Sequence, residues 1–299
     1  VVAVAWFTKS SDLEYADAQN VLADCYKNGV GVEKVNHSKA IDLYSKSAEQ
    51  GNAMAQCSLA NYYYEGKAVK QNYSKSFELY KKSAEQGISE AQYSLGNCYF
   101  NGLGVEQSYD IAIEWFVKAD NQGNANAQNE LGRCYYHAYG VEQDYVVAVN
   151  FFRKAAEQGH AMAQNYLGDC YYEGKGVEQS YDKAAEWHAK SAEQGDGKAL
   201  KDLGLSYYLG EGVAQNYEKA IELWTKSAEQ NNADAQYYLA NCYYEGKGVE
   251  QDYAVAVEWF DKAAVLGHDK AQNILGLCYY NAMGADQNYS RAFEWFSQS

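Results

Sequence analysis

A period of 36 residues runs through this chain and constrains its fold more than any other feature. The tetrapeptide AEQG occurs at 48–51, 84–87, 156–159 and 192–195, and degenerate copies stand at 120–123, 228–231 and 264–267. A leucine keeps the same spacing at Leu59, Leu95, Leu131, Leu167, Leu203, Leu239 and Leu275. Self-similarity at such a period predicts an array of one repeated supersecondary unit.

Each unit begins with an amphipathic helix, which we name helix A. In residues 89–102, Ala91, Leu95 and Cys98 fall on one stripe of a helix with about 100° per residue. Gly96 lies next to this stripe and leaves room for a neighbouring backbone. The glycine-containing segment that follows supplies turn conformations in a chain without proline, and it predicts a loop.

A second helix, helix B, completes the unit. Residues 110–123 carry an apolar face made of Ala112, Trp115, Phe116 and Ala119. We expect Asp110 to be the N-cap of this helix and Gly123 its C-cap. A hairpin of two such helices cannot bury its own apolar face, so successive hairpins must stack.

The predicted fold is therefore all-α, a right-handed superhelical α-solenoid of 36-residue helix-turn-helix repeats. We expect one continuous domain over residues 1–299. It begins with a helix B over 1–13 that has no helix A before it, and eight A/B helix pairs follow, the last cut short.

The pattern A…LGxCYY.GxGVEQDY.KA.EWF.KAAEQG, seen at 163–195 and 235–267, resembles the Sel-one-like repeat family, relatives of the tetratricopeptide repeats. The resemblance covers essentially the entire chain. It implies an adaptor or scaffold that binds other proteins, and it implies no single activity. Some bacterial members carry two cysteines per repeat joined by a disulfide, and this sequence departs from that pattern.

Charge and hydropathy narrow the set of partners. The net charge is −15, with 40 acidic residues against 25 basic ones. Such a surface repels a phosphate backbone, so we expect no nucleic acid partner. No apolar run is long enough to cross a bilayer, so we expect no membrane insertion. Protein or peptide partners remain.

Six of the seven cysteines recur at one position of helix A, at residues 25, 98, 134, 170, 242 and 278. A disulfide needs Cα atoms within about 7 Å, and stacked helices should lie farther apart, at roughly 9–10 Å. We expect small buried core thiols, which do not reveal the redox compartment. No metal site and no cofactor are predicted.

Catalytic motifs have simpler interpretations in this sequence. The GLGVEQ segment joins two helices and recurs in every unit, which favours turn chemistry over phosphate binding. Ser180 and Lys183 have the S-x-x-K spacing but lack the companion motifs. The five histidines are scattered, at 37, 137, 160, 188 and 268. We therefore expect no enzyme.

The most informative candidate site is a surface. In a solenoid of this type helix A lines the concave side, and there a polar row would stand beside an aromatic row. The alternative is that the tyrosines pack between helices and the polar side chains are merely solvated. The candidate protein-binding residues are Asn61, Tyr64, Asn97, Phe100, Tyr136, Asp169, Tyr172, Tyr208, Asn241 and Tyr244.

The two ends repeat the internal helix B motif and carry no polar capping helix. This predicts either a fragment of a longer array or head-to-tail self-assembly with other copies. The candidate end-to-end contacts are Val4, Trp6, Phe7, Phe293, Trp295 and Phe296. Three N-x-S sequons in the loops between helices A and B are candidate N-glycan sites, at Asn36, Asn72 and Asn288.

Overall fold

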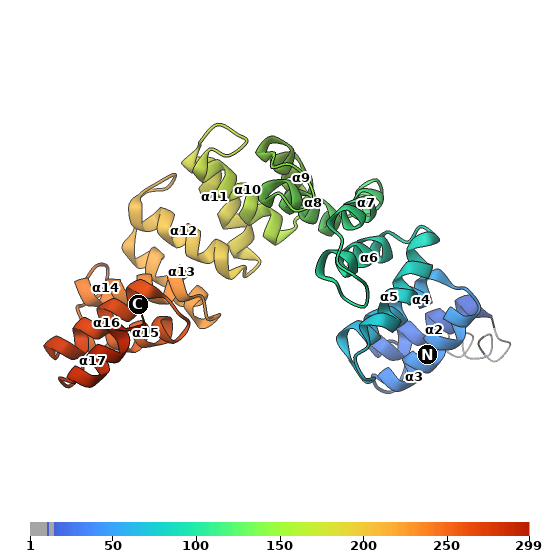
Figure 1. Cartoon of the computed structure of the whole chain (residues 1–299), viewed down its shortest axis with the longest axis horizontal. Helices are drawn as coiled ribbons and strands as arrows, with labels where there is room; N and C mark the ends of the chain where they lie inside the picture. The colour runs from blue at the N-terminus through green and yellow to red at the C-terminus, as the bar shows by residue number, and fades with distance from the viewer. Residues whose placement is uncertain (1–10, 12–14, 299) are drawn as a thin grey trace. The chain divides into compact units, whose positions relative to one another are not determined.

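The computed structural model describes Ser11 and residues 15–298. The chain forms two compact units, residues 1–144 and 145–299. All the regular elements of the described residues are helices (Figure 1). The all-α repeat solenoid predicted from the period is confirmed. The single continuous array over 1–299 stays a prediction, and the helix expected over 1–13 lies outside the described residues except for Ser11.

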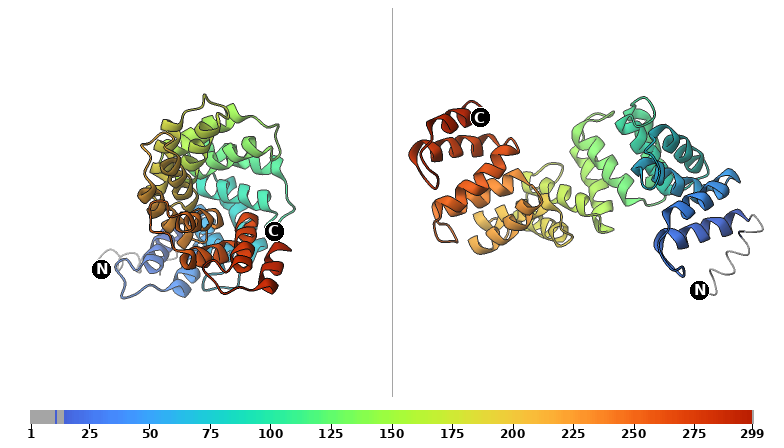
Figure 2. Two further views of the ribbon diagram at one scale, coloured as in Figure 1. Left: turned by 90° about the vertical axis from the view of Figure 1, so that its left-hand side faces the viewer. Right: turned by 90° about the horizontal axis from the view of Figure 1, so that it is seen from below.

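Helices A and B alternate along the chain. The helices A are α2 (Ala16–Asn28), α4 (Ala53–Glu65), α6 (Ser89–Asn101), α8 (Ala125–His137), α10 (Ala161–Glu173), α12 (Gly197–Leu209), α14 (Ala233–Glu245) and α16 (Asp269–Asn281). The helices B are α3 (His37–Glu49), α5 (Tyr73–Glu85), α7 (Tyr109–Asp120), α9 (Tyr145–Glu157), α11 (Tyr181–Glu193), α13 (Tyr217–Glu229), α15 (Tyr253–Val265) and α17 (Tyr289–Phe296). Within each of the two compact units, every helix packs against the next one along the chain (Figures 1 and 2).

Helix B begins at a polar cap one or two residues earlier than the sequence suggested. In α7 the cap is Ser108, whose hydroxyl accepts from the Ile111 N–H, and Asp110 already lies in the first turn. Our assignment of Asp110 was wrong because a cap needs extended backbone, which Ser108 has. Gly123 likewise lies beyond the end of α7, where its φ of 79° shapes the turn to the next helix.

The predicted core stripe is buried. Ala91, Leu95 and Cys98 have no exposed surface. Gly96 makes room for a side chain as well as for backbone, because a Cβ there would lie 2.6 Å from the Phe116 ring and 3.2 Å from the Ala112 carbonyl oxygen. The two helices of one repeat therefore interlock by placing a helix B ring over a helix A position that lacks a side chain.

Loops between helices A and B pack against the preceding repeat. Gly212 has a φ of 72°, and a Cβ there would collide with the backbone of Tyr181 at the start of the preceding helix B. The recurring glycine thus serves a backbone contact between repeats, as expected for turn chemistry.

A glutamine at the fourth position of helix A binds two neighbouring helices B. The Gln56 side chain donates from Nε2 to the Ala48 carbonyl oxygen at 3.2 Å. Its Oε1 accepts from Gln86 Nε2 at 2.8 Å. The same side-chain pairing joins Gln50 to Gln19, Gln122 to Gln92 and Gln194 to Gln164. This buried row was not predicted, although glutamine at a fixed place in seven of eight units was its signal.

Candidate functional site

The aromatic row expected on the concave side lies at the edge of the A–B hairpins. The Tyr172 ring packs edge-on against Tyr181, the first residue of the next helix, with centroids 5.2 Å apart. Its hydroxyl donates to Glu211 Oε2, in the A–B loop of the next repeat, at 2.8 Å. The other members with this edge-on contact to the first residue of helix B are Tyr64, Phe100, Tyr208 and Tyr244. Each is half-buried or buried, as is Tyr136.

Hydrogen bonds from the aromatic row also join neighbouring repeats. Lys247 in one loop donates to the Tyr208 hydroxyl of the preceding repeat at 3.0 Å. Such contacts are of the kind required by the alternative interpretation, in which the tyrosines pack between helices. Protein binding by this row stays a prediction.

The polar row at the ninth position of helix A also has partners inside the chain. Asn61 accepts from the Tyr80 hydroxyl through Oδ1 at 2.5 Å. Asn241 donates from Nδ2 to the Tyr237 carbonyl oxygen at 3.1 Å. Asn97 is half-buried at the equivalent position. Sequence reasoning missed that the eighth residue of helix B faces this row.

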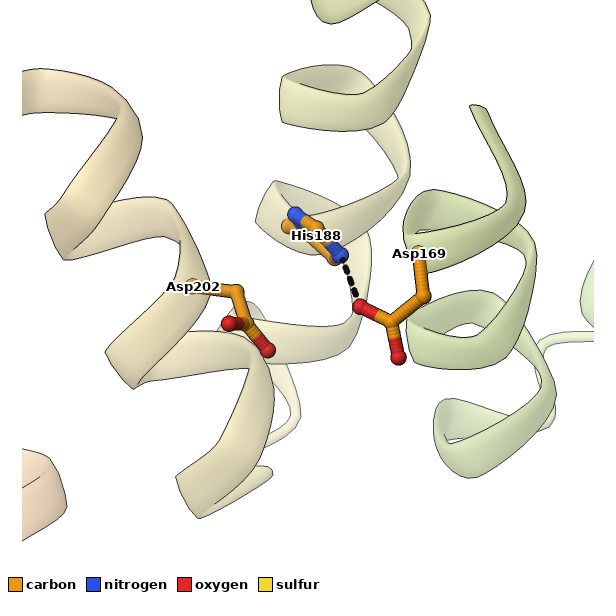
Figure 3. A group of neighbouring side chains, drawn as sticks. All are labelled: Asp169, His188 and Asp202. Carbon is orange, nitrogen blue, oxygen red and sulfur yellow. Dashed lines mark hydrogen bonds and ion pairs between the residues drawn. The ribbon is translucent and has the colours of Figure 1, made fainter. Parts of the chain in front are cut away.

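Asp169 belongs to the same row and forms a charged cluster with His188 and Asp202 (Figure 3). His188 projects from α11 and is 1% exposed. Its Nε2 lies 3.0 Å from Asp169 Oδ1. Gly168 makes this position of the ring available, because a Cβ there would meet the imidazole. Asp202 approaches from α12, the first helix of the next repeat.

Lys201 supplies the cation of this cluster. Its Nζ lies 2.5 Å from Asp202 Oδ1. Burial of Lys201 disfavours its charged form, but the carboxylates of Asp202, Asp234 and Asp169 outweigh that effect and raise its pKa. Burial and the neighbouring Asp169 carboxylate raise the pKa of Asp202. Three carboxylates therefore act on the half-buried ammonium group of Lys201.

The cluster has donor atoms for a metal, but its hydrogen bonds argue for a different role. One ligand atom from each of Asp169, His188 and Asp202 lies within 4.8 Å of the others. His188 Nδ1 is buried without a hydrogen-bond partner, so a proton there would be an unpaired buried donor. The favoured tautomer carries its proton on Nε2, facing Asp169. That nitrogen then has no free lone pair for a metal, and we assign the cluster no metal role.

Two pockets accompany the cluster on the same side of helix A. One of about 350 Å³ is lined by Asn165, Tyr166, Asp169, Asp196 and Lys198 together with neighbouring turns. Another of about 450 Å³ is lined by Asp234, Tyr237, Tyr238, His268 and Lys270. In both, the second, fifth and sixth residues of a helix A form one wall. We call this surface, with Asp169 and Asp202, the helix A face of residues 145–298.

The six buried thiols are poorly suited to nucleophilic chemistry. All seven cysteines are free, and Cys25 alone is half-buried while the other six are buried. Burial raises the pKa of Cys170 to about 12, with smaller contributions from the nearby carboxylates. A thiol with this pKa is protonated at neutral pH.

The motif Ser180–Lys183 is a helix cap. The Ser180 hydroxyl accepts from the Lys183 backbone N–H at 3.4 Å. The candidate glycan residues Asn36, Asn72 and Asn288 cap α3, α5 and α17 in the same way. Their glycosylation stays a prediction.

The candidate end-to-end residues are described only in part. Phe293 is 72% exposed and Phe296 is 37% exposed. Trp295 packs against the core cluster of α15 and α16. Val4, Trp6 and Phe7 lie outside the described residues. Head-to-tail self-assembly stays a prediction.

Comparison with known proteins places these features in a wider group. A family model described as Sel1 repeat matches eight consecutive segments, at residues 16–52, 53–88, 89–124, 125–160, 161–196, 197–232, 233–268 and 269–299. A search of curated proteins gave no match. In the part of the chain that the structure describes, no helix has the length and apolar character needed to span a membrane.

Two solved structures are similar in both sequence and fold. A protective antigen present in uropathogenic Escherichia coli strains, displaying an SLR fold, is 33% identical with a TM-score of 0.82, and the match covers 99% of this chain and 63% of that one. This chain therefore spans less than two thirds of the antigen's length. A Sel1 repeat protein from Oxalobacter formigenes is 32% identical with a TM-score of 0.74, and the match covers 81% of this chain and 96% of that one.

Proposed function

Because the chain belongs to the Sel1 repeat family, we propose that it is a non-catalytic scaffold that binds other proteins, and that the helix A face of residues 145–298 holds an extended peptide. Family membership supports the general statement. The peptide and its place on this face are our proposal, which rests on charge and shape.

The observation that carries the proposal is the charge arrangement around Lys201. Asp169, Asp202 and Asp234 all act on this one ammonium group. The Asp169 side chain is 33% exposed and that of Asp202 is 18% exposed, so solvent reaches both. A carboxylate in excess over its local cations favours a basic ligand side chain, and arginine can bind it with two parallel hydrogen bonds. The chain's net charge of −15 would also speed association with such a ligand.

The two pockets of this face supply contacts for the ligand beside that basic side chain. Tyr166 borders the smaller pocket, and Tyr237 and Tyr238 border the larger. Tyrosine offers rigid contact area at a low cost in conformational entropy. Polar side chains next to the rings, such as Asn165 and Lys270, can pair with a peptide backbone.

The test uses two labelled peptides that differ in charge alone. Each is a short chain of Gly, Ser and Tyr residues with either arginine or the neutral isostere citrulline at its centre. Fluorescence anisotropy should show tighter binding of the arginine peptide to the wild type. Asp169→Asn should weaken that binding by roughly tenfold, about 1.4 kcal/mol, and asparagine at this position is natural to other repeats, as in Asn61 and Asn241.

Asp182→Asn is the matched control, because Asp182 is an exposed carboxylate on helix B, away from both pockets. It should leave the affinity unchanged. Equal binding of the citrulline peptide, or an equal loss in Asp182→Asn, would overturn the proposed role of the helix A face.

A further inference from the structure

A cavity of about 740 Å³ opens between α11, α12 and α13, and it shares Gln230 with the smaller pocket of the helix A face. Its apolar wall is formed by Ala189, Ala192, Leu200, Leu203, Tyr207 and Leu223. The cavity falls in the usual size range of protein ligand pockets, about 300–1,000 Å³. Its residues depart from the repeat pattern in two places.

The first departure is Leu200. The other seven helices A have glutamine at this position, at residues 19, 56, 92, 128, 164, 236 and 272. In the preceding repeat Gln164 accepts from Gln194 at 2.7 Å and donates to the Ala156 carbonyl oxygen at 3.1 Å. Leucine can do neither. Gln230 donates to the Gly195 carbonyl oxygen, a bond that Gln122 makes to Gly87 in addition to its bond to Gln92. The wall that is polar in other repeats is therefore apolar here.

The second difference is at Leu223. Four other repeats have tryptophan at this position of helix B, at residues 115, 187, 259 and 295, whereas Leu43 and Leu79 hold it in the first two repeats and Phe151 in the fourth. Trp259 packs against the core cluster that contains Ala228 and Leu239. The residues equivalent to Ala228 and Leu239 are Ala192 and Leu203, and both line the cavity. The open space thus lies where four other repeats place an indole.

A lysine is already positioned beside this space. In the preceding repeat Lys190 pairs with Glu186 at 2.6 Å, and its Nζ lies 4.0 Å from the centroid of the Trp187 ring. Lys226 makes the equivalent pair with Glu222, also at 2.6 Å, and lines the cavity, but the residue three before it is Leu223. An ammonium group over an apolar site attracts the negative face of an aromatic ring more than an aliphatic side chain.

We propose that this cavity is a docking site for an aromatic side chain, tryptophan by preference, presented by a partner protein. The partner's ring would pack on Ala192 and Leu203 and lie under Lys226, much as Trp115 lies under Lys118 and Trp259 under Lys262. This gives the scaffold a second binding surface, whose cavity shares Gln230 with the smaller pocket of the helix A face.

The test compares N-acetyl-tryptophanamide with N-acetyl-leucinamide as probes of the full chain. Saturation-transfer-difference NMR at millimolar probe should give a signal for the tryptophan probe that is several times larger than for the leucine probe. Leu223→Trp fills the cavity with the residue the chain itself uses elsewhere, and it should abolish the signal. Leu200→Gln, which restores the repeat pattern, should weaken it.

Leu79→Trp is the matched control. Leu79 holds the same helix B position in the second repeat, where Gln56 is retained, and this change should leave the signal intact. Circular dichroism checks that each variant is helical, and arginine-peptide binding should persist in Leu223→Trp, so the two surfaces are tested separately. No wild-type signal, an undiminished signal in folded Leu223→Trp, or equal signals from the two probes would overturn the proposal.

Discussion

The imidazole Nε2 of His188 hydrogen-bonds Asp169 Oδ1 at 3.0 Å, where two other repeats place a tyrosine hydroxyl. Tyr44 donates to Asp24 Oδ1 and Tyr80 to Asn61 Oδ1, each at 2.5 Å. The eighth residue of helix B and the ninth of helix A therefore form a polar pair in these three repeats. His188 differs because Asp202 and Lys201 lie close by.

We expect His188→Phe to be tolerated and His188→Ala to be costly. Phenylalanine occupies this position at Phe116, Phe152 and Phe260, so the ring volume is kept and the half-exposed Asp169 regains water. The cost should be within about 1 kcal/mol, whereas the cavity left by alanine should cost about 3 kcal/mol. Hydrogen exchange of amides in α10 and α11 measures both, since repeats open locally. Equal protection in the two variants would contradict this account.

The effect of Asp202 on the free energy of unfolding should depend on pH. The folded chain raises its pKa, so the ionised carboxylate disfavours folding. This penalty is present near neutrality and is relieved as the pH falls through the raised pKa of the folded state. Asp202→Asn, neutral throughout, should have a thermal midpoint above that of the wild type near neutral pH, and the gap should narrow on acidification. A gap that widens in acid would show the opposite sign of coupling.

Thiol alkylation should distinguish Cys25 from the other cysteines. Cys25 is half-buried. Burial keeps the reagent from Cys98, Cys134 and Cys242. It also raises the pKa of these thiols to about 12, so that they carry almost no thiolate at neutral pH. Iodoacetamide with mass spectrometry should label Cys25 alone in the native chain and all seven after denaturation. Native labelling of Cys98 at a similar rate would show that the repeats open more readily than their packing indicates.

Ala138→Gly should stabilise the compact unit of residues 1–144. Ala138 follows α8 with a φ of 62°, the left-handed conformation that glycine adopts after six other helices A. The left-handed conformation costs alanine about 1–2 kcal/mol. Glycine avoids this cost, but its greater freedom in the unfolded chain offsets part of the gain in stability. We expect a net gain of about 0.5–1 kcal/mol, seen as a higher thermal midpoint. Ala282→Gly, at the equivalent place in the last repeat, should act in the same direction, and a lower midpoint in both would refute the argument.

The periodic sequence by itself determined the repeat unit, the helix pairs and the buried stripe. Ala91, Leu95 and Cys98 could be assigned to the core because one helix, with its own 3.6-residue period, decides which side chains share a face. Local rules failed only at boundaries, where Ser108 rather than Asp110 caps α7. Family membership followed from the same local pattern.

Only the tertiary structure decided which side chains meet between repeats. Asp169, His188 and Asp202 come from three helices, and nothing in their spacing distinguishes a solvated aspartate from one facing a buried ring. Tyr172 and Glu211 are likewise brought together by stacking. Leu200 and Leu223 are ordinary helix residues in the sequence, but both border an open cavity, since the first replaces a glutamine and the second holds a position where four repeats have tryptophan. Stacking brings distant segments to one junction, so the contacts there depend on several side chains at once, which a one-dimensional period does not specify.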